Sequence, residues 1–269
     1  MNILVCVKQV PDTTQVKIDP VTNTLIREGV PAIVNTFDAF ALEAAARIKD
    51  KNPDTQIYVL SMGPENAKNA LKECLAIAAD KAYLVSGRKF GGSDTLATSY
   101  IIYNAVKKIE SLEGFTFDAI FCGKQAIDGD TAQVGPELAE HLDYPQVTCG
   151  LEVELKDGRL EVLKEDQDAN QLIGIKLPCV VTFTKPNFDP RNPTIKRRMA
   201  ANRSTIPTLT ETDFEGIIDE TRIGLKGSPT HVKRSFVPVK NRHGEIIKEE
   251  TVEDSSAKLI QILSDTHVI

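Results

Sequence analysis

Hydrophobic and polar positions in the first half of the chain follow two alternating periodicities. Short apolar runs rich in β-branched residues predict buried strands at 2–9, 56–61, 82–86 and 117–122. Segments with apolar residues at i, i+3 and i+4 predict helices at 38–49, 64–79, 94–109 and 131–142. Asp38 is a candidate cap of the first helix. Strands that alternate with helices predict a parallel sheet covered on both faces.

The pattern changes after about residue 149. Two alternating runs at 151–155 and 159–163 flank Lys156-Asp157-Gly158, which predicts a β-hairpin. A last buried strand is predicted at 177–184, and the prolines and asparagines of 185–193 predict a loop. The expected fold is α/β: a doubly wound, mostly parallel Rossmann-like sheet with a β-hairpin insertion.

The C-terminal segment predicts an extended arm followed by a helix. Periodicity is weak over 224–246, whereas 251–266 carries an apolar stripe that includes Leu259 and Leu263. A helix of this length is marginal alone, so its stripe needs a surface. That surface is either its own domain or another subunit, and we favour the subunit. We therefore divide the chain into a nucleotide-binding α/β domain, 1–222, and an arm with a helix, 223–269.

Composition and charge exclude several function classes. The net charge of −6 does not indicate the positively charged surface that nucleic-acid binding requires. The cysteines form no CxxC pair, so we expect neither disulfides nor zinc, and a reducing compartment. Residues 1–8 are too short for a signal peptide, and no apolar stretch is long enough to span a membrane. We expect a soluble, cytoplasmic protein.

Catalytic motifs are missing from the sequence. No two histidines have metal-ligand spacing, and GxSxG, HExxH and GxxxxGK[ST] motifs do not occur. The sequence therefore predicts no catalytic and no metal-ligating residue, and a cofactor would carry any chemistry.

The most informative segment is 123–135 (GKQAIDGDTAQVG), a Gly- and Asp-rich turn between a predicted strand and a predicted helix. Free N–H groups at such a helix start bind phosphates, and open α/β sheets bind nucleotides at this edge. Four further turns, at 6–8, 34–38, 61–64 and 87–95, fall at the same edge. Each has a structural alternative: Ser93, Asp94 and Thr95 also suit plain helix caps. Their convergence predicts a nucleotide-binding crevice.

The chain resembles the β-subunit of electron-transfer flavoproteins over nearly its whole length. The resemblance rests on four segments: 4–8 (LVCVK), 34–38 (VNTFD) with 41–45 (ALEAA), 123–135, and 176–182 (KLPCVVT). Cys179 stands where many members have alanine. The resemblance implies a heterodimer with an FAD-carrying α-subunit, on which the arm and helix at 223–269 would dock.

Two branches of this family differ in the nucleotide of the β-subunit. Housekeeping members hold a structural AMP, and electron-bifurcating members hold a second FAD that meets NADH. Residues 91–99 (GGSDTLATS) and Gly129 are similar to the bifurcating branch. A second glycine-rich helix start also suits a pyrophosphate, which AMP lacks.

The resemblance also implies individual contacts. Those expected on the adenosine side are Cys6, Asn35, Met62, Gly63 and Pro64. Those expected in the loop that wraps the nucleotide are Gly123, Gln125, Ala126, Ile127, Asp128, Thr131, Gln133 and Val134. Gly91, Gly92, Asp94 and Thr95 are candidates for the phosphate or ribitol of FAD, and Ile195, in a proline-rich loop, for docking to an acyl-CoA dehydrogenase.

The resulting hypothesis is a bifurcating β-subunit, an electron carrier that oxidises NADH. It would pass electrons to ferredoxin or flavodoxin and, through the α-subunit FAD, to an acyl-CoA dehydrogenase. The alternatives are a housekeeping β-subunit with AMP and a stand-alone regulatory protein that binds an adenine nucleotide.

Overall fold

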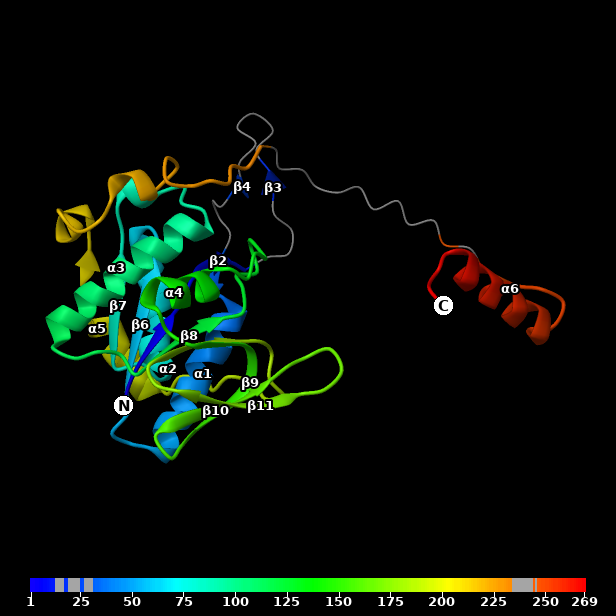
Figure 1. Ribbon diagram of the computed structural model, residues 1–269, viewed down its shortest axis with the longest axis horizontal. Coiled ribbons are helices and arrows are strands. Elements are labelled where there is room, and N and C mark those ends of the chain that lie inside the picture. The colour runs from blue at the N-terminus through cyan, green and yellow to red at the C-terminus, as the bar shows by residue number, and fades with distance from the viewer. Residues whose placement is uncertain (13–16, 19–24, 27–30, 234–243, 245) are drawn as a thin grey trace. The chain divides into compact units, whose positions relative to one another are not determined.

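The computed structural model describes residues 1–12, 17–18, 25–26, 31–233, 244 and 246–269 (Figure 1). The chain divides into two compact units. The first comprises Met1–Lys17 with Leu25–Lys233, and the second comprises Ile18–Thr24 with Arg234–Ile269. The first unit therefore continues beyond residue 222. Of the predicted arm, 234–243 and 245 lie outside the described residues.

A sheet of nine strands forms the described core of the first unit, in the order β11-β10-β9-β12-β8-β1-β6-β7-β13. The strands are β1 (Asn2–Cys6), β6 (Gln56–Met62), β7 (Lys81–Val85), β8 (Ala119–Gly123), β9 (Gln146–Lys156), β10 (Arg159–Lys164), β11 (Gln171–Lys176), β12 (Cys179–Phe183) and β13 (Thr208–Leu209). Neighbours are parallel except at β9–β10 and β10–β11. From β1 the chain adds β6 and β7 on one side, then β8 and β12 on the other. This confirms the doubly wound, mostly parallel prediction.

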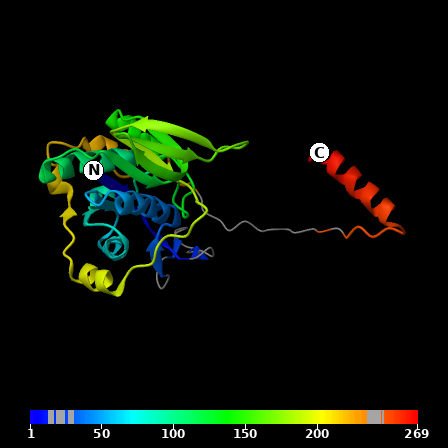
Figure 2. The same cartoon turned by 90° about the horizontal axis from the view of Figure 1, so that it is seen from below.

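Helices cover both faces of the sheet. They are α1 (Thr36–Lys51), α2 (Lys68–Ile77), α3 (Thr95–Glu113), α4 (Val134–Leu142) and α5 (Ile195–Arg203). Along β1, Ile3 and Val5 join the core under α1 and α2, whereas Leu4 and Cys6 join the core under α3 and α4. Figure 1 shows α3 and α4 side by side, and Figure 2 shows α1 and α2 together on the other face. The all-apolar run of β1 is thus the pattern of a strand buried on both faces.

Several predicted boundaries need correction. The strand predicted at 2–9 ends at Cys6, and a separate strand, β2 (Gln9–Pro11), pairs with β5 (Ala32–Val34). Two further short strands, β3 (Lys17–Ile18) and β4 (Leu25–Ile26), lie outside the large sheet. The helix predicted at 64–79 begins as a 3₁₀ turn at Glu65–Ala67 before α2.

The predicted hairpin is confirmed in β9 and β10. Asp157 and Gly158 have φ values of +49° and +75°, which suit a two-residue turn. The sequence reasoning missed β11, β13 and α5. The first two strands are short or polar, and α5 carries too few apolar residues for a periodic stripe.

In the second unit, α6 (Val252–Asp265) matches the helix predicted at 251–266. Thr251 caps it by accepting a hydrogen bond from the Asp254 N–H at 3.1 Å. None of its residues is buried. Across the described ranges of the chain, every helix is too short or too polar to cross a membrane.

Candidate nucleotide-binding site

The direction of strand addition reverses between β1 and β8, so a crevice is expected beyond their carboxyl ends. Cys6 and Cys122 are register partners at these ends. Both thiols are buried. The pKa of the Cys122 thiol is raised, mainly by its hydrogen bond with Cys6 and secondly by burial. This end of the sheet is therefore lined by buried, uncharged side chains.

The side chain of Asp38 joins the two strand ends. Its Oδ2 accepts a hydrogen bond from the Lys8 N–H at 2.7 Å, and its Oδ1 accepts one from the Gly123 N–H at 3.1 Å. Burial raises the pKa of Asp38 to about 7, against the lowering effect of these bonds and of Asn35. Asn35, not Asp38, is the N-cap of α1, so the capping prediction was wrong. Asp38 instead positions the crevice, a role with no local sequence signal.

Asn35 holds the loop at 123–133 in place. Its Nδ2 donates to the Gln125 carbonyl at 2.8 Å, and its Oδ1 accepts from the Ile127 N–H at 3.0 Å. Its own N–H donates to the Lys8 carbonyl at 2.9 Å. The side chain is fully buried. Asn35 therefore shapes the loop that was predicted to wrap the nucleotide.

The same loop is held by two side-chain contacts, one from Lys8 and one within the loop. The Lys8 ammonium donates to Asp128 at 2.7 Å, and Gln125 Nε2 donates to Asp130 at 2.7 Å. Asp130 and Ala132 have positive φ, at +53° and +55°. This backbone delays the start of α4 to Val134, three residues after the predicted start at 131.

The N-terminus of α4 has no side-chain cap. Gln133 occupies the N-cap position, but its side chain accepts no bond from the helix. The first N–H groups of a helix lack intrahelical partners and carry a partial positive charge. Ala126 and the 40% exposed side chain of Ile127 lie on the loop between the switch point and this helix start. The arrangement suits an anion such as a phosphate.

Residues 62–64 reach the same edge from β6. The Gly63 N–H donates to the Val85 carbonyl at 3.0 Å, and a Cβ at Gly63 would lie 3.3 Å from Ala67 Cβ. Met62 is half-buried and Pro64 is exposed, and their contact with a nucleotide stays a prediction.

The turn at 91–95 is largely occupied by the segment that follows residue 222. Asp94 caps α3, with Oδ1 accepting from the Ala97 N–H at 3.1 Å and Oδ2 from the Thr230 N–H at 3.0 Å. The Asp94 N–H donates to Ser228 Oγ at 2.8 Å. A Cβ at Gly92 would lie 2.7 Å from Leu225. The plain-cap alternative thus describes Asp94, and its contact with FAD stays a prediction.

Thr95 connects the starts of two helices. Its hydroxyl lies 3.2 Å from Gln133 Oε1, at the start of α4, and 3.2 Å from Glu137 Oε1. Thr131 and Gln133 are exposed beside it. The structure therefore places Thr95 next to the loop at 123–133, as the convergence of turns predicted.

Ile195 lies apart from this crevice, as the first residue of α5. The expectation of a loop at this position was wrong, although its side chain is 81% exposed. The guanidinium of Arg191 is bound by Glu43 at 2.8 Å and by Asp50 at 2.6 Å, both on α1. Arg197 donates to carbonyls at the end of α2, including that of Leu75 at 3.0 Å. Two arginines therefore fix the helix that presents Ile195.

Comparison with known proteins assigns the family. A model described as "Electron transfer flavoprotein domain" matches residues 22–214. The electron transfer flavoprotein subunit beta of Megasphaera elsdenii is 48% identical over 261 residues, covering 97% of this chain and 95% of that protein. Subunit CarD of the caffeyl-CoA reductase-Etf complex of Acetobacterium woodii is 45% identical over 269 residues, the full length of both. Protein FixA of Azorhizobium caulinodans is 42% identical over 241 residues, covering 88% and 85%. The chain belongs to the family of electron-transfer flavoprotein β-subunits.

Proposed function

We propose that this chain is the β-subunit of a heterodimeric, bifurcating electron-transfer flavoprotein that holds FAD and accepts hydride from NADH. One electron would go to ferredoxin or flavodoxin, and the other, through the α-subunit FAD, to an acyl-CoA dehydrogenase. The observation that carries the proposal is the uncapped start of α4 beside the strand-order reversal. Such a site suits a nucleotide phosphate.

The residues present fit the adenine-nucleotide half of the cofactor. The loop at 123–133 is preorganised by Asn35, Asp38 and Lys8, so it needs little reordering to hold a ligand. The flavin supplies the redox chemistry when it is bound. The chain binds and orients the nucleotide and keeps water from the apolar floor at Cys6 and Cys122.

One observation supports FAD over AMP. The starts of α3 and α4 adjoin at Thr95 and Gln133, and because Asp94 caps α3, the Thr95 side chain is the group of α3 that lies beside the open start of α4. A pyrophosphate can contact Thr95 and the start of α4 together, whereas the single phosphate of AMP needs only the latter. Separately, one full-length relative is a subunit of a caffeyl-CoA reductase-Etf complex, which supports coupling to an acyl-CoA enzyme.

Docking to the α-subunit is assigned to residues 223–269, and docking to the dehydrogenase to Ile195. The amphipathic α6 has no buried residue within the described part of its unit, which supports a partner for its stripe. The exposed cations Lys196 and Arg198 of α5 support an acidic partner around Ile195. We place this complex in the cytoplasm.

The test is the nucleotide content of the purified heterodimer, measured after denaturation by chromatography. The bifurcating proposal predicts two flavins per heterodimer and NADH-dependent reduction of an artificial dye. One flavin with AMP would establish the housekeeping alternative instead. A stable monomer that does not co-purify with an α-subunit would favour the stand-alone nucleotide-binding regulator.

A further inference from the structure

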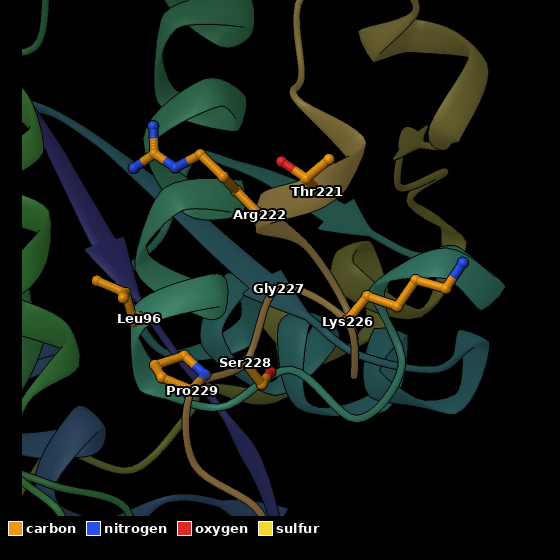
Figure 3. A pocket seen from close by; sticks show the side chains of 7 residues that line it. All are labelled: Leu96, Thr221, Arg222, Lys226, Gly227, Ser228 and Pro229. Atoms are coloured by element: carbon orange, nitrogen blue, oxygen red, sulfur yellow. The ribbon is translucent and has the colours of Figure 1, made fainter.

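A second cavity lies beside the first turn of α3, about 320 Å³ in volume. Its lining is Leu96, Thr221, Arg222, Lys226, Gly227, Ser228 and Pro229 (Figure 3). None of these residues belongs to the crevice predicted from the sequence. Leu96 follows Thr95, however, so the cavity opens next to the point where α3 and α4 begin.

The wall of this cavity is rigid. The Gly224 N–H donates to Ser93 Oγ at 3.0 Å, and Ser228 Oγ donates to the Gly224 carbonyl at 2.7 Å. A Cβ at Gly227 would lie 2.0 Å from the Arg222 carbonyl carbon, so only glycine permits this close approach. The cavity is therefore present before any ligand binds.

Arg222 supplies a preorganised cation at the rim. Its guanidinium carbon lies 3.9 Å from the centre of the Tyr100 ring, and Tyr100 is held by a hydrogen bond from the Asp219 N–H at 3.0 Å. Stacking on an aromatic face fixes the guanidinium plane and leaves its N–H fork available. In Figure 3 the side chain of Arg222 crosses α3 above Leu96.

No carboxylate in the described part of the chain forms an ion pair with Arg222, and none of its residues accepts a hydrogen bond from the guanidinium. Asp219 is near, but its Oδ1 already accepts bonds from the Thr221 N–H at 2.9 Å and hydroxyl at 2.7 Å. Burial and then the Arg222 charge lower the pKa of His141, the titratable ring that also packs on Tyr100. Hydrogen bonds from Thr221 and then the Arg222 charge lower the pKa of Asp219, so this carboxylate partly offsets the charge of Arg222 without forming an ion pair with its guanidinium.

Leu96 and Pro229 supply the apolar part of the cavity lining, beside the polar side chains of Thr221 and Ser228. Leu96 is 42% exposed, and Pro229 lies beside it in Figure 3. A fixed guanidinium beside a small apolar floor suits a phosphate joined to a ribose or a planar ring. We propose that Arg222 binds a phosphate of the incoming nicotinamide dinucleotide at this cavity, an inference that rests on the NADH oxidation proposed above.

The chain offers a matched control for this proposal. Lys226 lines the same wall, so the control is Lys176, an exposed lysine on β11 that is not part of the cavity lining. Arg222→Gln removes the guanidinium, Arg222→Lys keeps the charge without the fork, and Lys176→Gln removes an equal charge from outside the cavity.

The experiment uses the purified heterodimer with its resident nucleotides in place. Calorimetry measures the binding of ADP-ribose, a redox-inactive probe, and dye reduction gives the KM for NADH. Arg222→Gln is expected to raise both the dissociation constant of ADP-ribose and the KM for NADH by about 10- to 100-fold, because a charge-assisted bidentate contact is lost. Arg222→Lys should recover only part of this loss, and Lys176→Gln should stay within about twofold of the wild type, as expected of an exposed cation outside the cavity.

Equal ADP-ribose binding by the wild type and Arg222→Gln would overturn the inference, while the flavin count of the same samples would still report on the proposed function. Loss of the α-subunit from Arg222→Gln would also overturn it, because Arg222 would then belong to a subunit interface. A preparation with AMP and a single flavin would refute bifurcation, and the ADP-ribose titration would still test Arg222.

Discussion

The buried carboxyl of Asp38 makes a quantitative prediction about stability and pH. Its pKa is 3.8 in its unperturbed state and about 7 in the folded chain, chiefly because of burial. The folded state therefore favours the protonated form. The contribution of Asp38 to stability is complete below about pH 4 and is lost as the pH rises towards 7. The full loss is on the order of 4 kcal/mol, at 1.4 kcal/mol for each pH unit between the two values.

The substitution Asp38→Asn removes this titration. An amide has one acceptor oxygen, so it satisfies only one of the N–H groups of Lys8 and Gly123 that the carboxyl serves. An unsatisfied buried N–H costs about 1–3 kcal/mol. The variant should therefore have a lower free energy of unfolding than the wild type near pH 5. Between pH 5 and pH 8 only the wild type loses stability through Asp38, so the free energy of unfolding of the variant should rise by about 3 kcal/mol relative to that of the wild type.

Denaturant titrations of the wild type and the variant, with the same nucleotide saturation at each pH, measure this shift in the free energy of unfolding. Asp54→Asn, at an exposed carboxyl, is the matched control and should follow the wild type at every pH. If the curves of the wild type and Asp38→Asn run parallel between pH 5 and 8, Asp38 does not titrate in this range and the reasoning is refuted.

Four further predictions concern the site and its partners. Gly123→Ala places a Cβ 2.3 Å from Asp38 Oδ1, so it should cost about 1–3 kcal/mol in denaturant titrations and lower nucleotide retention; full retention would contradict this. Ile195→Ala should reduce electron transfer to the dehydrogenase by about tenfold while NADH–dye activity persists, and a loss of both would make the residue structural. Arg191→Gln removes the ion pairs with Asp50 and Glu43 on α1 and leaves Glu43 with Arg47 alone, so stability should fall by about 1–3 kcal/mol, whereas an unchanged denaturation midpoint would show that the Arg191 ion pairs contribute nothing. Truncation after Lys233 should abolish co-purification with the α-subunit but not nucleotide binding by the first unit; an intact heterodimer would rule out the assigned docking role.

Local sequence patterns were sufficient to predict the alternating strands and helices in the first half of the chain. The strands β1, β6, β7 and β8 are short, apolar and β-branched, and the helices between them have apolar stripes, so neighbouring residues carry the signal. In contrast, α5 reads IKRRMAANR and has little apolar surface. Its position depends on Arg191 and Arg197, which contact α1 and α2 far away in the sequence.

The strand–helix alternation and the family were predictable from the sequence alone, and the role of the loop at 123–135 in a nucleotide site stays a prediction. These features are local, since a turn between a strand and a helix has its own composition. The contacts of the turn at 91–95, in contrast, are visible only in the folded chain. Ser228 and Thr230 bind Asp94, and Leu225 fills the space beside Gly92, from more than 130 positions along the chain. Hydrogen bonds and packing across such separations leave no periodicity in the sequence, so the same GGSD turn is compatible with a phosphate cradle or with a capped helix until the chain has folded.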